Sequence, residues 1–111
     1  MARQYYFSRD DWLRLAVEAN FSARRLAGAF GISQRQLERW THQLFGSTPH
    51  RWLREERMKL AAQALKQPVP IKTISAELGF KQPSHFSREF KRHHGVSPAA
   101  FFRSRQNVVF R

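Results

Sequence analysis

The chain has 111 residues, enough for one domain or two very small ones, and its 41% hydrophobic content includes ten Phe and three Trp. Lys and Arg number twenty against eight Asp and Glu, a net charge of +12, and fifteen of the twenty are Arg, which forks onto phosphates and guanine edges. The sequence contains no Cys, which excludes disulfides and thiol chemistry, and no long apolar run or signal-peptide pattern, so we expect a cytoplasmic protein.

An apolar residue followed by serine recurs where helices are expected to begin. Ser8 is a suitable N-cap for a helix to about Ala19, with Asp11 at the N3 position of a capping box and Phe7 before the cap. The same pair precedes three other predicted helices, at Phe21-Ser22, Ile32-Ser33 (where Gln36 would complete a second capping box) and Val96-Ser97. Glycines stand where the chain must reverse after or between helices, at Gly31, Gly46, Gly79 and Gly95.

Residues 48–67 form the longest predicted element. Thr48 is a good N-cap and Pro49 a good first helical residue, and no helix breaker follows until Pro68. An inward stripe is expected at Leu53, Arg57, Leu60 and Ala64, with Met58, Ala61 and Leu65 beside it. About 18 residues at 1.5 Å each make a strut of roughly 27 Å. Strand-like alternation is missing, so we expect an all-α fold of about seven helices.

The segments on the two sides of this strut resemble each other. Residues 26–49 align with residues 74–98, and Arg39 falls on Arg88 in that alignment. Each segment has the order of a helix-turn-helix, so the repeat indicates a duplicated supersecondary unit. The expected organisation is a first helix-turn-helix subdomain over 1–47, a linker helix over 48–67, a second helix-turn-helix subdomain over 68–106 and a frayed tail over 107–111.

The second helix of each unit has one apolar and one polar face. On a helical wheel the first places Leu37, Thr41 and Leu44 inward with Trp40 flanking them, and the second places Phe86 and Phe90 inward. The opposite faces carry arginines, hydroxyls and other hydrogen-bonding side chains. Side chains of this kind read base edges in a major groove, and with the charge and the duplicated turn they indicate DNA binding.

The runs LAGAFGISQRQLERW and IKTISAELGFKQPSHFSREFKRHHGVSP resemble the DNA-binding domain of the AraC/XylS family of bacterial transcription regulators, and the resemblance extends from about Trp12 to Arg105. It implies two helix-turn-helix units that enter successive major grooves of double-stranded DNA at the nucleoid, with RNA polymerase as a further partner. Because the two reading helices of a monomer would be unequal, we expect an asymmetric site and not a palindrome. The family's base- and backbone-contacting positions fall on Gln34, Arg35, Glu38, Arg39 and His42 in the first unit, and on Gln82, Ser84, His85, Ser87, Arg88 and Lys91 in the second.

The chain departs from the family pattern at several positions. Thr41 stands where an aromatic residue is usual, and Trp40 is expected to supply that volume. Ser75 replaces a small apolar residue, and we expect its hydroxyl to be buried and bonded back to its helix. Pro83 enters the first turn of its helix, which is tolerated there. The family's sensor domain is also missing, which fits either a short stand-alone member or an excised domain.

The expected roles differ between these residues. Arg35, Arg39 and Arg88 are expected to contact bases or the adjacent phosphates. Glu38 either accepts a hydrogen bond from cytosine N4 or pairs with Arg35 and His42 along its own helix, and the pairing is the favoured alternative. Phosphate contacts, or simply solvated charges, are expected at Arg24, Arg25, Lys91 and Arg92.

Other classes of function fit the sequence less well. No set of nucleophile, base or paired carboxylates indicates an enzyme, and no cofactor is expected. His85, His93 and His94 lack the Cys or acidic partners of a metal site. Residues 48–67 are basic and amphipathic, like a membrane-surface helix, but their apolar stripe is needed to hold the two units. Single-stranded nucleic acid is usually bound by stacking its bases on aromatic residues of a sheet, and the predicted reading elements here are helices. Non-specific architectural binding to the nucleoid is the alternative function.

Overall fold

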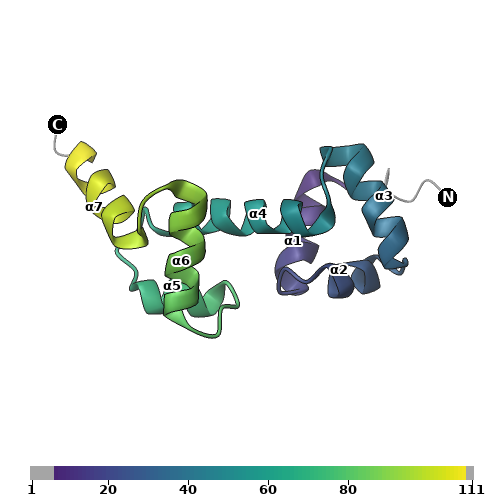
Figure 1. Ribbon diagram of the computed structural model, residues 1–111, viewed down its shortest axis with the longest axis horizontal. Helices are drawn as coiled ribbons and strands as arrows, with labels where there is room; N and C mark the ends of the chain where they lie inside the picture. The colour runs from purple at the N-terminus through teal and green to yellow at the C-terminus, as the bar shows by residue number, and fades with distance from the viewer. Residues whose placement is uncertain (1–6, 110–111) are drawn as a thin grey trace. The chain divides into compact units, whose positions relative to one another are not determined.

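The computed structural model describes residues 7–109 of the chain, and the side chains of residues 7–105. The described part contains seven α-helices and no strand, which confirms the all-α prediction (Figure 1). The helices are α1 (Arg9–Glu18), α2 (Ala23–Phe30), α3 (Gln34–Phe45), α4 (Pro49–Ala64), α5 (Ile71–Glu77), α6 (Pro83–His94) and α7 (Pro98–Val109). The chain divides into two compact units, Met1–Glu56 and Arg57–Arg111, and the division falls within α4.

The serine caps form at all four predicted helix starts. At α1 the capping box is complete: the backbone N–H of Asp11 donates to Ser8 Oγ at 3.1 Å, and that of Ser8 donates to Asp11 Oδ2 at 2.9 Å. Oγ atoms of the other serines accept from Arg25, Gln36 and Ala100. At Ser33 only this forward bond forms, without the return bond from the Ser33 backbone N–H to the Gln36 side chain that the second capping box required.

An aromatic cluster forms the core of the first unit. Trp12 of α1 is 1% exposed, and its ring lies 4.6 Å from that of Phe30 on α2, 6.3 Å from Trp40 on α3 and 5.6 Å from Trp52 on α4, measured between centroids. Phe45 adds a stacked contact with Trp52 at 4.8 Å. One indole therefore holds four helices, which fixes the orientation of α3 in this unit.

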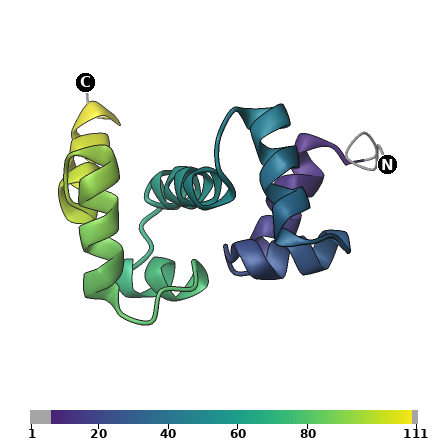
Figure 2. The same cartoon turned by 45° about the vertical axis from the view of Figure 1, so that its right-hand side comes forward.

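The second unit is built around α6. Phe86 and Phe90 are fully buried, and the ring of Phe90 meets that of Phe101 on α7 at 5.4 Å. The Nε2–H of His94 donates to the carbonyl of Met58 on α4, at 3.0 Å. Figure 2 shows α6 lying against α7, in agreement with their packing contacts. Buried and half-buried side chains on one side of α6 thus contact α4 and α7, and the opposite side of α6 faces outward.

The helix over 49–64 is shorter than expected and differs in its buried stripe. The expected helix to Gln67 stops at Ala64, where the N–H groups of Lys66 and Gln67 bond three residues back instead of four. In a continued helix the ring of Pro68 would clash with the carbonyl of Ala64, four residues back, which accounts for the early end. The fully buried positions in its second half and just after its end are Met58, Ala61 and Leu65, whereas Arg57, Leu60 and Ala64, expected at the centre of the stripe, are half-buried.

The C-terminal helix is longer than expected. α7 continues to Val109, so residues 107–109, assigned in the sequence to a frayed tail, are helical. Phe110 and Arg111, the rest of that tail, lie outside the described residues. The amide of Ala100 is capped by Ser97 Oγ at 3.1 Å, which starts α7 at the predicted residue.

Candidate nucleic-acid interface

A tight turn leads from α2 into α3. Gly31 ends α2 with φ 72° and ψ 32°, a left-handed conformation that costs a side-chain-bearing residue energy and glycine none. Ser33 then caps α3, its Oγ accepting from the N–H of Gln36 at 3.1 Å. The turn and the cap together set the residue at which α3 begins, and with it which side chains face outward.

The inner side of α3 is fixed by packing. Leu37, Trp40 and Thr41 are each at most 2% exposed, and the ring of Trp40 lies 5.5 Å from that of Phe30. Trp40 thus fills the core as expected, while the Thr41 hydroxyl donates to the carbonyl of Leu37 at 2.7 Å, so its burial carries no unpaired polar group. A helix held on this side presents the opposite side to solvent.

Leu44 is a correction to the predicted inner face. It is 42% exposed, although the wheel placed it inward with Leu37 and Thr41. Phe45 instead turns into the core, stacked on Trp52 and 5.2 Å edge-on from Trp12. The larger ring takes the space at that end of the cluster, which leaves Leu44 at the surface.

The structure places all five predicted α3 site residues on one exposed side, which we call the α3 face: Gln34, Arg35, Glu38, Arg39 and His42. Glu38 forms neither of the pairs expected along its helix, since no ion pair or hydrogen bond joins it to Arg35 or His42 among the described residues. The structure thus lacks the pairing that was the favoured alternative for Glu38. Its carboxylate remains available to a ligand.

A hollow of about 330 Å³ runs along one edge of the α3 face. Gln34, Glu38 and His42, spaced at i, i+4 and i+8, line its α3 side, and residues 47–50 at the start of α4 line the other. Arg35 and Arg39 do not line it. The α3 face therefore consists of two rows, one bordering a hollow and one carrying two arginines.

The turn into α6 is supported by Arg57, whose role the sequence analysis missed. Its guanidinium carbon lies 3.7 Å from the centroid of the Phe80 ring, and its Nε–H donates to the carbonyl of Leu78 at 3.0 Å. Leu78 is the C-cap of α5, and Gly79 follows it with φ 85°. Burial lowers the pKa of Arg57 and the charge of Glu89 partly opposes this shift. The sequence signal for this role was that Arg57 is the only charged residue in the stripe predicted over Leu53, Arg57, Leu60 and Ala64.

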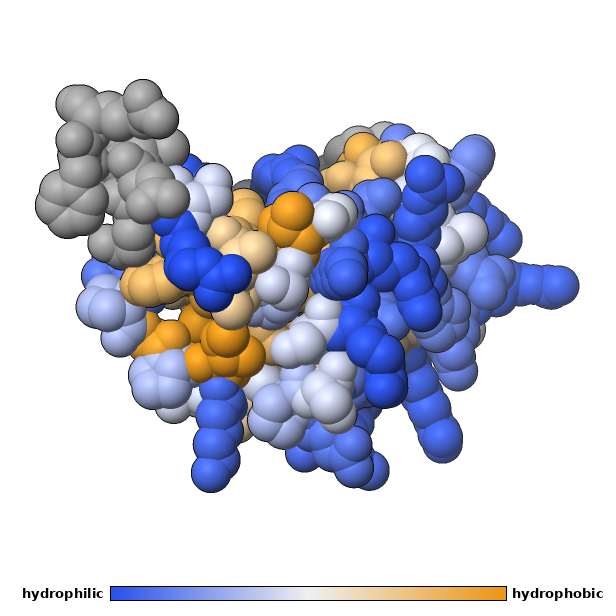
Figure 3. All heavy atoms as spheres, turned by 60° about the vertical axis from the view of Figure 1, so that its left-hand side comes forward, coloured by the Kyte–Doolittle hydropathy of each residue, from blue (hydrophilic) through white to orange (hydrophobic). Residues whose placement is uncertain are grey.

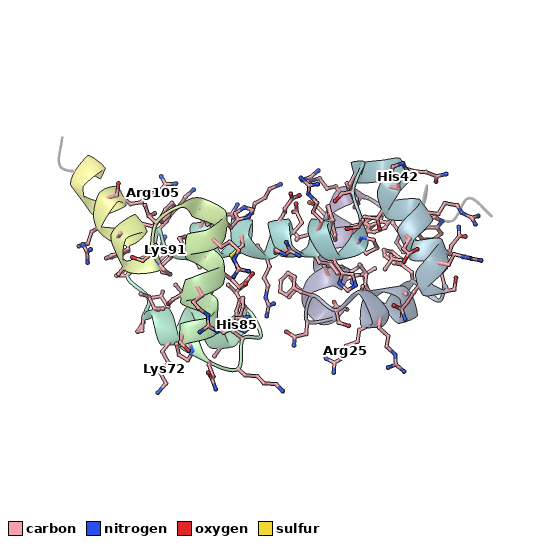
Figure 4. All side chains as sticks on the ribbon, in the orientation of Figure 1. Arg25, His42, Lys72, His85, Lys91 and Arg105 are labelled. Carbon is pink, nitrogen blue, oxygen red and sulfur yellow. The ribbon has the colours of Figure 1, made fainter. Side chains whose placement is uncertain are left out.

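The predicted α6 residues also share an outer side, which we call the α6 face: Gln82, Ser84, His85, Ser87, Arg88 and Lys91. Ser87 is half-buried and the others are exposed. His85 is held by its ring contact with Phe80, edge-on at 5.3 Å. Gln82 is the N-cap without a side-chain cap bond, and Pro83 occupies the first turn as expected. Figure 4 shows His85 and Lys91 on the same helix.

The flanking cations divide into two groups. Arg24 and Arg25 on α2 are exposed, and Figure 4 shows Arg25 extending away from the ribbon. Arg92, which was expected at phosphate or in solvent, instead pairs with Glu89 at 3.1 Å. Its side chain is 74% exposed, so this pair contributes little to stability. Arg24, Arg25 and Lys91 form no ion pair among the described residues.

Neither a metal site nor a membrane-spanning helix is found among the described residues. No group of three His, Asp or Glu side chains in this part of the chain could hold a metal ion. The Nε2–H of His94 already donates to the carbonyl of Met58. None of the helices in the described part has the length and apolarity needed to cross a bilayer.

Comparison with known proteins assigns the fold and its class of function. Residues 26–104 match the family model described as "Helix-turn-helix domain", of the AraC type. Among curated proteins, the HTH-type transcriptional activator RhaS of Escherichia coli is 34% identical over 90 residues, which cover 78% of this chain and 32% of RhaS. The HTH-type transcriptional regulator MtrA of Neisseria gonorrhoeae is 28% identical over 76% of this chain and 28% of its own. The chain therefore spans about a third of the length of these relatives.

Solved structures agree with this result. An AraC-type transcriptional regulator from Chromobacterium violaceum superposes with a TM-score of 0.68 at 30% identity, covering 86% of this chain and 93% of that one. The DNA-binding domain of AdpA, a global transcriptional factor solved in complex with a target DNA, superposes with a TM-score of 0.70 at 28% identity over 86% and 89% of the two chains. These relatives are DNA-binding transcription regulators, not enzymes.

Proposed function

The chain belongs to the AraC-type family of helix-turn-helix, DNA-binding transcription regulators, and from this premise we propose that it binds a specific, asymmetric site on double-stranded DNA. In this proposal the α3 face and the α6 face enter successive major grooves of one duplex. The observation that carries it is that each second helix of a helix-turn-helix is locked by its buried side and exposes a row of hydrogen-bonding residues. Unequal faces on one chain favour an asymmetric site over a palindrome.

Arginines supply the main base contacts in this proposal. Arg35, Arg39 and Arg88 are exposed, and a guanidinium can donate two parallel hydrogen bonds to O6 and N7 of guanine. Each good bidentate contact discriminates against a wrong base by about 1–3 kcal/mol. The hydroxyls of Ser84 and Ser87 and the amides of Gln34 and Gln82 offer donors and acceptors to other bases.

Glu38 takes a selective role in the same proposal. A carboxylate near DNA is repelled by phosphates, so it opposes binding unless it gains a specific partner. Glu38 is exposed beside an open hollow and has no cation partner on its own helix, which supports acceptance of a hydrogen bond from cytosine N4. Its substitution by Gln should then relax specificity at one base pair without weakening binding to random DNA.

Phosphate contacts position the protein on the duplex. The exposed and unpaired Arg24, Arg25 and Lys91 are suited to this role, as is His42 at the end of the α3 face. If roughly 6–10 phosphates are neutralised, affinity falls by about 10³–10⁵ between 50 and 200 mM salt. Steep salt dependence alone would also fit non-specific binding, so the sequence preference has to be measured separately.

The wider assignment follows from the family. We propose DNA-reading subdomains over 1–47 and 68–106, connected through 48–67, acting as a monomer on DNA in the bacterial cytoplasm. RNA polymerase is the proposed protein partner, and activation is the proposed outcome because RhaS is described as a transcriptional activator. The matched part is about a third of the length of RhaS and MtrA.

In-vitro selection of duplexes from a random pool tests this function. The expected result is one enriched, non-palindromic site with two conserved half-sites about one helical turn apart. The matched controls are Arg39→Ala, which should lose information only in one half-site, and Arg88→Ala, which should lose it only in the other. A pool that remains random, with affinity set by salt alone, would instead support non-specific architectural binding.

A further inference from the structure

An apolar groove of about 420 Å³ lies in the second unit, away from the α6 face. It is lined by Leu65, by the segment 68–71 that leads into α5, and by Ala99, Phe102 and Arg103 of α7. No α6 residue lines it, so DNA binding leaves the groove unexplained. Figure 3 shows apolar side chains gathered on one face of the molecule with hydrophilic side chains around them.

One wall of the groove is held rigid by its sequence. Pro68 and Pro70 fix their φ angles, and the N–H of Val69 between them donates to the carbonyl of Gln67 at 2.7 Å. Leu65 is only 1% exposed and anchors the start of this segment in the core. Because this wall is already ordered, binding a ligand would not cost the conformational entropy that is lost when a mobile loop becomes ordered. The volume also lies within the range of small-molecule sites, about 300–1,000 Å³.

The charged residues in the two segments that line the groove, 65–72 and 98–105, are all positive. Arg103 is part of the lining, while Lys66 and Lys72 adjoin the lining residues Leu65 and Ile71 in the chain. All three are exposed and none belongs to an ion pair among the described residues. Figure 4 shows Lys72 extending outward from the start of α5. No Asp or Glu occurs within 65–72 or 98–105 to neutralise them.

We propose that this groove binds a small organic carboxylate, with its apolar body between the 68–71 segment and Phe102 and its carboxylate on the Arg103 guanidinium. Apolar walls with one well-placed polar group are typical of small-molecule sites, and a planar guanidinium matches a carboxylate with two hydrogen bonds. A phosphate of DNA is a poorer occupant, because it would place a fully hydrated anion against Leu65, Val69 and Phe102. The site is separate from the α3 and α6 faces, so its failure would leave the proposed DNA binding untouched.

The test is an NMR titration of the ¹⁵N-labelled full chain, first with 2-naphthoate and then with its neutral analogue 2-naphthamide. The expected result is saturable shifts of amides confined to 65–72 and 99–103, with 2-naphthoate binding at least tenfold more tightly than the amide. Arg103→Gln should lower the affinity for 2-naphthoate to the affinity for 2-naphthamide. Ala99→Leu, which fills the groove without removing a contact, should weaken both ligands at least tenfold.

Arg105→Gln is the matched control, because Arg105 is on the same helix but lies over the Phe101 ring, at 5.1 Å, and does not line the groove. It should leave both affinities unchanged. Equal affinity for 2-naphthoate and 2-naphthamide, equal losses in Arg103→Gln and Arg105→Gln, or shifts centred on α3 and α6 would each overturn the proposal. The unchanged dispersion of the remaining amide signals in each variant shows that the variant has folded.

Discussion

Replacing Arg57 by Met should destabilise the second unit and loosen the turn that positions α6. The substitution keeps most of the aliphatic stem but removes the guanidinium that stacks on Phe80 at 3.7 Å and donates to the Leu78 carbonyl at 3.0 Å. A charged hydrogen bond contributes about 1.5–3 kcal/mol and a partly desolvated cation–π contact about 0.5–2 kcal/mol.

The net loss is smaller than that sum, because Met does not have to be stripped of water as the half-buried guanidinium is. Burial already lowers the pKa of Arg57, which is the sign of this desolvation cost. We expect a net loss of about 2 kcal/mol in the free energy of unfolding of residues 57–109, roughly a 30-fold change in the folded-to-unfolded ratio.

Urea unfolding followed by circular dichroism, with hydrogen exchange at the amides of 78–86, measures this loss. Phe80→Leu alone should cost less, and the double variant should show a coupling of about 1 kcal/mol because the two side chains are in contact. Arg54→Met, at an exposed position of the same helix, should change stability by less than about 0.5 kcal/mol. A loss in Arg57→Met no larger than in Arg54→Met would refute the positioning role.

Three further outcomes are expected. Ser75 is buried with an Oγ that has no partner, so Ser75→Ala should stabilise the chain by about 1 kcal/mol in the same urea assay; a loss of stability would mean that the hydroxyl is bonded. Asp11, whose pKa is lowered from 3.8 mainly by the Ser8 backbone hydrogen bond, contributes stability that is present above about pH 3.8 and is lost as pH falls through the lower folded-state value. Thermal unfolding of Asp11→Asn should therefore depend less on pH below 3.8 than that of the parent, and parallel curves would contradict the cap. Arg39→Ala should weaken binding to the selected site by about 1–3 kcal/mol, and an equal loss on random DNA, measured by anisotropy, would make Arg39 a phosphate contact instead.

Local signals were the most predictive part of the sequence. The serine caps, the left-handed glycines and the outward rows of the two second helices depend on residues within a few positions of each other, so they could be derived without knowing the fold. All eleven predicted site residues lie on exposed or half-exposed positions of α3, α6 or the α6 cap. Their DNA contacts stay predictions.

The misses involve competition between distant side chains. Leu44 and Phe45 are adjacent apolar residues, and only the contacts of Phe45 with Trp12 and Trp52 show that Phe45 is the one packed inside. Ser75 was expected to bond back to its helix, but its Oγ is without a partner. Arg57 appeared as an odd member of an apolar stripe, because its partners Leu78 and Phe80 lie more than twenty positions away. Such pairings are set by tertiary packing, which a helical wheel does not contain.

The central claim, that the α3 and α6 faces read one duplex together, is tested most directly by helical phasing of the selected site. Five base pairs inserted between the half-sites would rotate one half-site to the opposite side of the duplex, since B-DNA repeats every 10–10.5 base pairs. The claim predicts that affinity falls to that of a single half-site. It also predicts that inserting ten base pairs does not restore affinity, because the claim includes a strut of fixed length over 48–67, as expected from the sequence. Unchanged affinity after the five-base-pair insertion, measured at the same salt concentration, would contradict the claim.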